Sequence, residues 1–302
     1  MADPGGPTSI DTVMFGLPRS TAAHLVPASR PALVDVGSDS TVPAVTTSLR
    51  QMGVESIEAI FLTHIHFDHA GGAGQIARRF PDAQVYVPER VAKHLIDPSR
   101  LTEGVRSVWG ELTEKLFGLP EPVPSDRVVP VKDGDRIDLG DRSLLAIATP
   151  GHTRAHVSYL DESTGALICG DALGINLPNF DVVRPATPPA DFSLEESLDS
   201  IEKIRDSGAE EVYVAHFGLV QGDLGRNCDR SSAALERWWE MFERERLESQ
   251  GEEDLLRRVH CALEAGMEPI RPGQRRILET VNPAWLNLSG MSIAASRVSP
   301  GA

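Results

Sequence analysis

The sequence predicts a layered α/β fold, with two sheets in two similar halves and helices on the outside. Two observations predict this fold. Apolar runs of strand length recur along the N-terminal two thirds, and several are followed by a histidine or an aspartate. The order of strands, a loop with titratable side chains, a helix and a further strand also occurs roughly twice. A chain of 302 residues is long enough for one large domain or for a domain and a subdomain.

The first half shows the patterns of strands that alternate with helices. Residues 57–63 (IEAIFLT) form a nearly continuous apolar run, which is typical of a buried strand. Gly53 is placed to end the helix that precedes this run. In order, we expect a hairpin over 22–37, a helix over 42–53, the strand over 57–63, a helix over 72–80 and a strand over 83–88.

The second half follows an insert at 89–126, which has helical and loop character and many prolines. Ser193 and Glu196 form a capping box, and Gly208 ends the helix that they begin. Strands are predicted at 127–131, 135–140, 143–151, 156–160 and 166–171, and a last strand at 211–218 follows the capped helix.

The chain changes character after Gly225. Residues 230–250, 253–266 and 282–297 are predicted helices. We therefore divide the chain into a layered domain over 1–225, whose insert at 89–126 we expect to line a functional site, and a C-terminal helical extension over 226–302 that we expect to pack on the core. The apolar patch of Trp238, Trp239, Met241 and Phe242 suits helix packing or a contact between two copies in a homodimer.

Composition and charge narrow the function classes. The formal charge of −15 repels phosphate backbones, so we expect a small-molecule substrate and no nucleic-acid partner. Three cysteines without a C-x-x-C pair do not suit a disulfide framework. The start of the chain lacks a basic segment followed by an apolar run, and no apolar stretch is long enough to span a membrane. We expect a cytoplasmic protein without a membrane partner.

The stretch LTHIHFDHAGG at 62–72 is unusually rich in titratable groups. It follows a predicted buried strand, and ligand sites of layered α/β folds lie at the carboxyl ends of strands. A solvated loop that happens to contain histidines is the structural alternative. Three further residues of metal-binding types, His152, Asp171 and His216, also lie after a predicted strand or near its end. Their similar placement favours a metal site.

Five imidazoles and two carboxylates without a thiolate suit zinc, and also iron or manganese. This number of groups fits two metal ions with three ligands each, and one carboxylate that both ions share. The candidate metal ligands are His64, His66, Asp68, His69, His152, Asp171 and His216.

The motifs THIHFDHAGG, TPGHT, CGDAL and AHFG resemble the successive motifs of the metallo-β-lactamase superfamily. LVDVG at 33–37 and the loop RPATPP are similar to its glyoxalase-II-like and uncharacterised small hydrolases. The resemblance implies a four-layer αβ/βα sandwich. It also implies that His64, His66 and His152 hold one metal, that Asp68, His69 and His216 hold the second, and that Asp171 bridges them. Asp35 would support the histidine loop through hydrogen bonds.

The resemblance implies a dinuclear, zinc-dependent hydrolase of a small ester, thioester or lactone, in which a metal-bridged hydroxide attacks a carbonyl. Asp68 and Asp171 are the expected catalytic carboxylates. Two alternatives stay open: a phosphodiesterase or nuclease of the same fold, and a sulfur dioxygenase with a single iron. The basic residues expected of an enzyme for glutathione thioesters are scattered here, at Arg257, Arg258, Arg271, Arg275 and Arg276.

Overall fold

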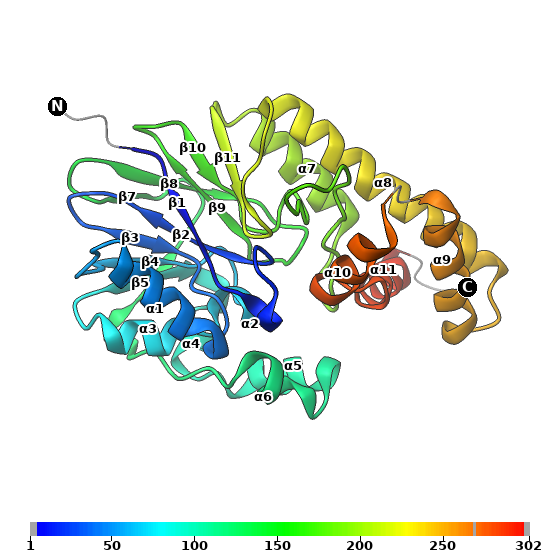
Figure 1. The fold of residues 1–302 in the computed structure, drawn as a ribbon, viewed down its shortest axis with the longest axis horizontal. Coiled ribbons are helices and arrows are strands. Elements are labelled where there is room, and N and C mark those ends of the chain that lie inside the picture. The colour runs from blue at the N-terminus through cyan, green and yellow to red at the C-terminus, as the bar shows by residue number, and fades with distance from the viewer. Residues whose placement is uncertain (1–4, 268–269, 299–302) are drawn as a thin grey trace.

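The computed structural model describes residues 5–267 and 270–298 and contains two six-stranded sheets (Figure 1). The first sheet has the order β1-β2-β3-β4-β5-β6, with antiparallel pairs up to β3 and parallel pairs beyond it. Its strands are β1 (Thr8–Asp11), β2 (Ala22–Val26), β3 (Ala32–Val34), β4 (Ala59–Phe61), β5 (Gln84–Pro88) and β6 (Val128–Val131).

The second sheet has the order β12-β11-β10-β9-β8-β7 and is antiparallel except for the parallel pair β10 and β11. Helix α7 connects these two parallel strands, as a parallel pair requires a crossover. The strands are β7 (Arg136–Asp138), β8 (Ser143–Ala148), β9 (Val157–Asp161), β10 (Ala166–Ile168), β11 (Glu211–Val214) and β12 (Gly218–Leu219).

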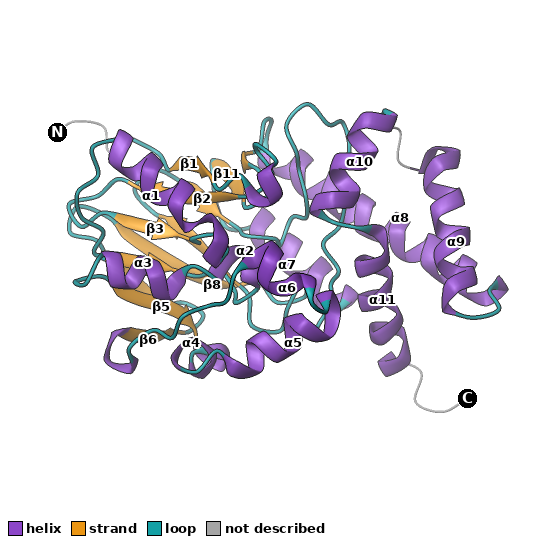
Figure 2. Ribbon diagram, turned by 60° about the horizontal axis from the view of Figure 1, so that its bottom comes forward, coloured by secondary structure: helices purple, strands orange, loops and turns teal. Residues whose placement is uncertain are grey.

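Helices cover both outer faces and form a separate group at the C-terminal end (Figure 2). α1, α3 and α7 belong to the outer layers, and α4, α5 and α6 form the insert between β5 and β6. The helices are α1 (Val42–Gln51), α2 (Phe67–Ala70), α3 (Ala73–Arg79), α4 (Lys93–Ile96), α5 (Ser99–Trp109), α6 (Leu112–Phe117), α7 (Leu194–Arg205), α8 (Leu224–Glu248), α9 (Glu252–Ala262), α10 (Pro272–Val281) and α11 (Ala284–Val298). Short 3₁₀ turns occupy η1 (Met14–Gly16), η2 (Asp39–Thr41), η3 (Glu89–Val91) and η4 (Ser125–Arg127), and a π-helical turn covers Leu263–Met267.

Three apolar clusters define four layers. One cluster joins α1 and α3 to the outer face of the first sheet, for example through Leu49 and Ile60. The second lies between the sheets, where the rings of Phe61 and Tyr159 meet edge to face with centroids 5.0 Å apart. The third joins the second sheet to α7, α8, α9 and α11, with Trp238 buried in it. The predicted αβ/βα sandwich and its C-terminal helices are thus confirmed.

Several predicted strands are shorter than expected, among them those at 135–140, 143–151 and 166–171, and the physical reason is clear for two others. The run at 57–63 pairs only over β4, since the amide of Thr63 donates to the carboxylate of Asp35 instead of a neighbouring strand. The run at 211–218 splits at a turn after Val214, and β12 folds back on β11. Gly218 has a φ of +69°, which favours glycine at this reversal.

Among the described residues, none of the helices combines the length and the apolar composition needed to cross a bilayer. Helix α10 is an element that the sequence patterns did not predict. Pro272 opens it at a position where proline costs no hydrogen bond.

Candidate metal centre

All seven candidate ligands lie at one edge of the sandwich, on loops that follow strands of both sheets. His64 and His66 follow β4, and α2 carries Asp68 and His69. The remaining three come from the second sheet: His152 follows β8, Asp171 follows β10 and His216 lies in the turn between β11 and β12. The structure therefore brings together residues that are more than 150 positions apart in the sequence.

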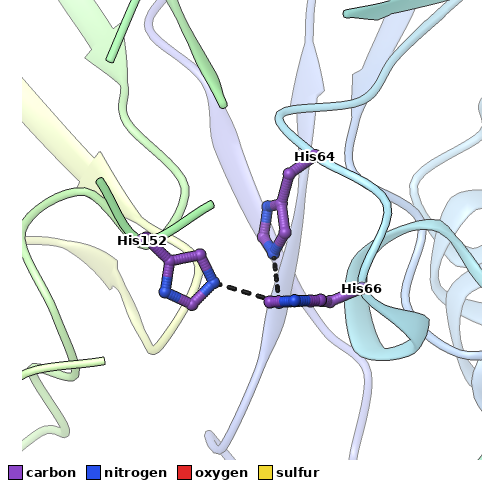
Figure 3. Close-up of side chains that lie close together, drawn as sticks. All are labelled: His64, His66 and His152. Carbon is purple, nitrogen blue, oxygen red and sulfur yellow. Dashed lines mark hydrogen bonds between the residues drawn. The ribbon is translucent and has the colours of Figure 1, made fainter. Parts of the chain in front are cut away.

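The first trio consists of His64, His66 and His152 (Figure 3). The Nδ1 atom of His66 lies 3.0 Å from the Nε2 atom of His64 and 3.0 Å from the Nε2 atom of His152. Burial and, next, the neighbouring His152 lower the pKa of His66 to about 3. Burial also lowers the pKa of His64 and of His152, so all three rings stay neutral near pH 7.

Hydrogen bonds on the far side of two rings determine where their protons are. The Nδ1 atom of His152 donates to the carbonyl of Ala186 at 2.8 Å, so its Nε2 atom keeps a lone pair. The hydroxyl of Thr63 donates to the carboxylate of Asp35, so it accepts from the Nδ1 atom of His64. Two lone pairs thus face the Nδ1 atom of His66, which carries at most one proton. A cation between the three nitrogens satisfies all of them.

The second trio consists of Asp68, His69 and His216, whose ligand atoms lie within 4.8 Å of one another. The Oδ2 atom of Asp68 is 3.5 Å from the Nε2 atom of His69 and 3.4 Å from that of His216. The Nδ1 atom of His216 donates to the carbonyl of Ser20, which leaves its Nε2 atom free to face the carboxylate.

The carboxylate of Asp171 lies between the two trios. Its Oδ2 atom is 3.4 Å from the Nε2 atom of His152 and 3.5 Å from that of His69, and its Oδ1 atom is 3.6 Å from the Nε2 atom of His216. One carboxylate therefore reaches histidines of both groups. This is the position that a shared ligand of two ions requires.

Two further features show that the residues fit cations. The Nε2 atom of His69 and the Oδ1 atom of Asp171 are buried and have no hydrogen-bond partner. Burial lowers the pKa of His69, but the carboxylates of Asp68, Asp171 and Asp35 outweigh burial and raise it well above the usual value. The cluster thus favours positive charge between its carboxylates, where it can hold a divalent ion.

The residues that support the ligands through hydrogen bonds were predicted only in part. Asp35 was expected to support the histidine loop, and it accepts from the Nδ1 atom of His69 at 2.9 Å. Thr63 was missed, although its place directly before His64 is a usable signal. The carbonyls of Ser20 and Ala186 were also missed, because any residue type carries a carbonyl. His156 is buried and accepts a hydrogen bond from the amide of Asp171, so it supports the loop that carries this carboxylate.

The family model for the metallo-beta-lactamase superfamily matches residues 17–216, which include all seven candidate ligands. The chain belongs to the metallo-beta-lactamase superfamily. Members of this superfamily are metallo-hydrolases, and their fold implies the binding of divalent metal.

Three relatives illustrate the range of metallo-beta-lactamase proteins that this chain resembles. This chain is similar to the metallo-beta-lactamase fold-containing protein ST1585 of Sulfurisphaera tokodaii, with 31% identity over 55% of this chain and 63% of that protein. The crystal structure of ST1585 aligns at a TM-score of 0.69 over 95% of this chain and 98% of that one, with 23% identity. The crystal structure of the family protein TTHA1429 of Thermus thermophilus aligns at a TM-score of 0.67, with 20% identity over 97% of this chain and 93% of that one. A hydroxyacylglutathione hydrolase of Vibrio cholerae is 31% identical over 47% of this chain and 42% of its own length.

Proposed function

We propose that this metallo-beta-lactamase fold protein is a dinuclear metal-dependent hydrolase of an ester, a thioester or a lactone of small size. The observation that supports this proposal is the position of Asp171, whose two carboxylate oxygens face histidines of both trios. A structural cluster of histidines does not need this arrangement. The hydroxyacylglutathione hydrolases among the relatives, which are thioester hydrolases by name, agree with carbonyl chemistry.

The two trios divide the ligands between two ions. We assign His64, His66 and His152 to the first ion and Asp68, His69 and His216 to the second, with Asp171 shared. Imidazole and carboxylate ligands favour zinc and also accept iron or manganese.

Bound divalent ions would polarise a substrate carbonyl and lower the pKa of a water molecule. The chain itself aligns the reactants. Asp68 is the carboxylate of the cluster with the more exposed side chain, 22% against 5% for Asp171, and it lines the adjacent cavity. We assign to its carboxylate the transfer of a proton from the attacking water to the leaving group. The Nε2 atoms of His69 and His216, both buried, lie 3.5 and 3.4 Å from the Oδ2 atom of Asp68, so the carboxylate and the two rings converge on one ion position.

Metal analysis and four substrates test the proposal. We expect about two zinc-like ions per chain, because each trio offers one set of ligands. We also expect the purified protein to turn over at least one of a p-nitrophenyl ester, a thioester and a lactone faster than bis-p-nitrophenyl phosphate. Turnover of the phosphodiester alone, or a single iron with sulfur dioxygenase activity, would contradict the proposal.

The variant Asp171→Asn tests the shared ligand. Its neutral amide cannot balance two cations, so we expect the metal content to fall to one ion or fewer per chain and turnover to fall more than about 100-fold. Asp126→Asn, at an exposed carboxylate outside the site, is the matched control and should behave like the wild type. Equal metal content in the two variants would remove Asp171 from the site.

A further inference from the structure

A large cavity opens above the candidate metal centre. Its volume is about 880 Å³, and the residues at its base include His66, Asp68, His152, Asp171 and His216. Pockets that enclose whole small molecules have volumes of about 300–1,000 Å³. The cavity therefore has room for much more than the bond that is cleaved, and its walls determine what else the substrate carries.

Helix α5 forms one wall with an apolar face that is only partly covered, since its residues pack in part on the cluster of Met14, Phe67 and Phe117. Leu101, Val105, Val108 and Trp109 recur at helical spacing and line the cavity. None of the residues of α5 is fully buried. On the other side of this helix, Arg106 is exposed and does not line the cavity. The half-buried part of this apolar face that remains exposed thus lines the cavity beside the centre.

Aromatic rings connect this wall to the opposite one. The ring of Trp109 meets the ring of Trp285 on α11 edge to face, with centroids 5.3 Å apart, and it meets Phe117 of α6 at 5.6 Å. Phe117 in turn contacts Phe15 and Phe67, at 5.4 and 6.1 Å. Edge-to-face pairs of this kind are favourable, so they fix the relative positions of the walls.

The charges around the cavity do not suit a strongly anionic group. Among the described residues, Arg100 is the one arginine or lysine that lines the cavity, and the carboxylates of Asp191 and Glu252 line it as well. The five arginines considered above for glutathione thioesters lie in the described ranges, and none of them lines the cavity. A polyanionic carrier has no cluster of cations to bind here, whereas an apolar chain finds a matching surface.

We propose that the substrate of this site carries an apolar acyl chain of medium length, which lies between α5 and α11 with its carbonyl at the metal centre. This inference rests on the proposed hydrolase function. In the reaction, the bond between the acyl carbon and the leaving oxygen or sulfur breaks. The acyl carbon gains the hydroxyl of a water molecule, and the leaving group gains the remaining proton.

A series of esters measures the contribution of the chain. Zinc-loaded, full-length protein is assayed with p-nitrophenyl acetate, butyrate, hexanoate and octanoate. Burial of one methylene group contributes enough for about a fourfold gain. We therefore expect kcat/KM to rise about threefold to fourfold per methylene until the cavity is filled. A series that is flat, or that falls from acetate onward, would overturn the inference while leaving the hydrolase function intact.

Two variants place the effect on α5. Val105→Asn and Leu101→Asn each put an amide on the apolar wall, so we expect the octanoate-to-acetate ratio of kcat/KM to fall at least tenfold. Arg106→Gln changes the exposed side of the same helix and should keep the wild-type ratio. An unchanged ratio in both asparagine variants would show that the chain lies elsewhere.

Ligand binding separates this inference from the hydrolase function. Calorimetry compares octanoate with acetate, which share the carboxylate and differ in the chain. At least tenfold tighter binding of octanoate, lost in Val105→Asn, supports the apolar site even if every ester stays intact, in which case the hydrolase function fails alone. Equal binding of the two carboxylates would contradict the apolar site even in an active enzyme.

Discussion

At the scale of single residues, the centre depends on which ring nitrogen of each histidine carries the proton. His69, His152 and His216 each donate from Nδ1 to an acceptor behind the ring: a carboxylate in the first case and a backbone carbonyl in the other two. In each ring Nε2 is therefore the atom that faces the centre. Such outer hydrogen bonds orient the ligands before any ion binds, which reduces the cost of binding.

Asp35 is the outer partner with the largest number of contacts. Its carboxylate accepts from the ring of His69 and from both the amide and the hydroxyl of Thr63, and it is buried. In Asp35→Asn, the new NH₂ group must face either His69 or Thr63, which are themselves hydrogen-bond donors. One of these hydrogen bonds is therefore lost. We expect metal affinity to fall about 10–100-fold, as measured by competition with a chelator.

The control for this variant is Asp138→Asn, an exposed carboxylate of β7, which should leave metal affinity unchanged. If Asp35→Asn bound metal as tightly as the wild type, Asp35 would have a role in folding and not in the support of His69.

At the scale of elements, the C-terminal helices hold the loop that carries Ala186. The amide of Thr187 donates to the side chain of Asn287 on α11 at 2.8 Å. Gly290, also on α11, has no room for a Cβ because the backbone of this loop lies against it. Arg184 is buried and forms an ion pair with Glu279 of α10 at 2.7 Å. The carbonyl that orients His152 is thus positioned by helices far along the chain.

The variant Asn287→Ala tests this connection. It leaves the buried amide of Thr187 without its acceptor, so the loop should shift and His152 should lose its fixed orientation. We expect metal affinity to fall roughly tenfold. Asn287→Asp keeps the acceptor for Thr187 but loses the donor to the Oδ1 atom of Asn282, so we expect it to recover only part of the affinity.

Ser296→Ala, on the exposed side of the same helix, is the matched control. Equal metal affinity in Asn287→Ala and Ser296→Ala would mean that α11 supports the fold without acting on His152.

The elements also show what the sequence can and cannot predict. The strands that precede His64, Asp171 and His216 were predictable, because a buried strand needs a continuous apolar run and the polar residues after it mark its end. The grouping of the seven ligands was predictable for the same reason. The connection between His152 and Asn287 was not predictable. It passes through a backbone carbonyl and through a hydrogen bond between residues that are 100 positions apart in the sequence. The insert at 89–126 was expected to line the site, but its mixed helical and loop character did not indicate the apolar face of α5. The division of the chain at residue 225 stays a prediction.

At the scale of the whole molecule, each trio takes ligands from both halves of the sandwich. His64 and His66 come from the first sheet and His152 from the second. The second trio likewise combines Asp68 and His69 with His216. Any ion bound by a complete trio therefore connects the two sheets.

Removal of metal should for this reason destabilise the entire fold. Ions that bind the folded state alone stabilise it by mass action, by about 4 kcal/mol at a free concentration 1,000 times the dissociation constant. We expect a chelator to lower the midpoint of thermal unfolding, and zinc added in excess of the chelator to restore it. The Asp171→Asn variant should show a smaller shift. An identical midpoint with and without chelator would indicate that the cluster binds no ion in the folded protein.

The division of each trio between the sheets has a consequence for assembly. Before the two sheets dock, the first half of the chain can offer two of the three ligands of each trio, and the second half offers only single ligands that are far apart in the sequence. Tight coordination can arise only after the sheets dock in the correct register, so we expect metal to bind at the end of folding. A chain whose sheets dock wrongly should therefore be recovered with little bound metal.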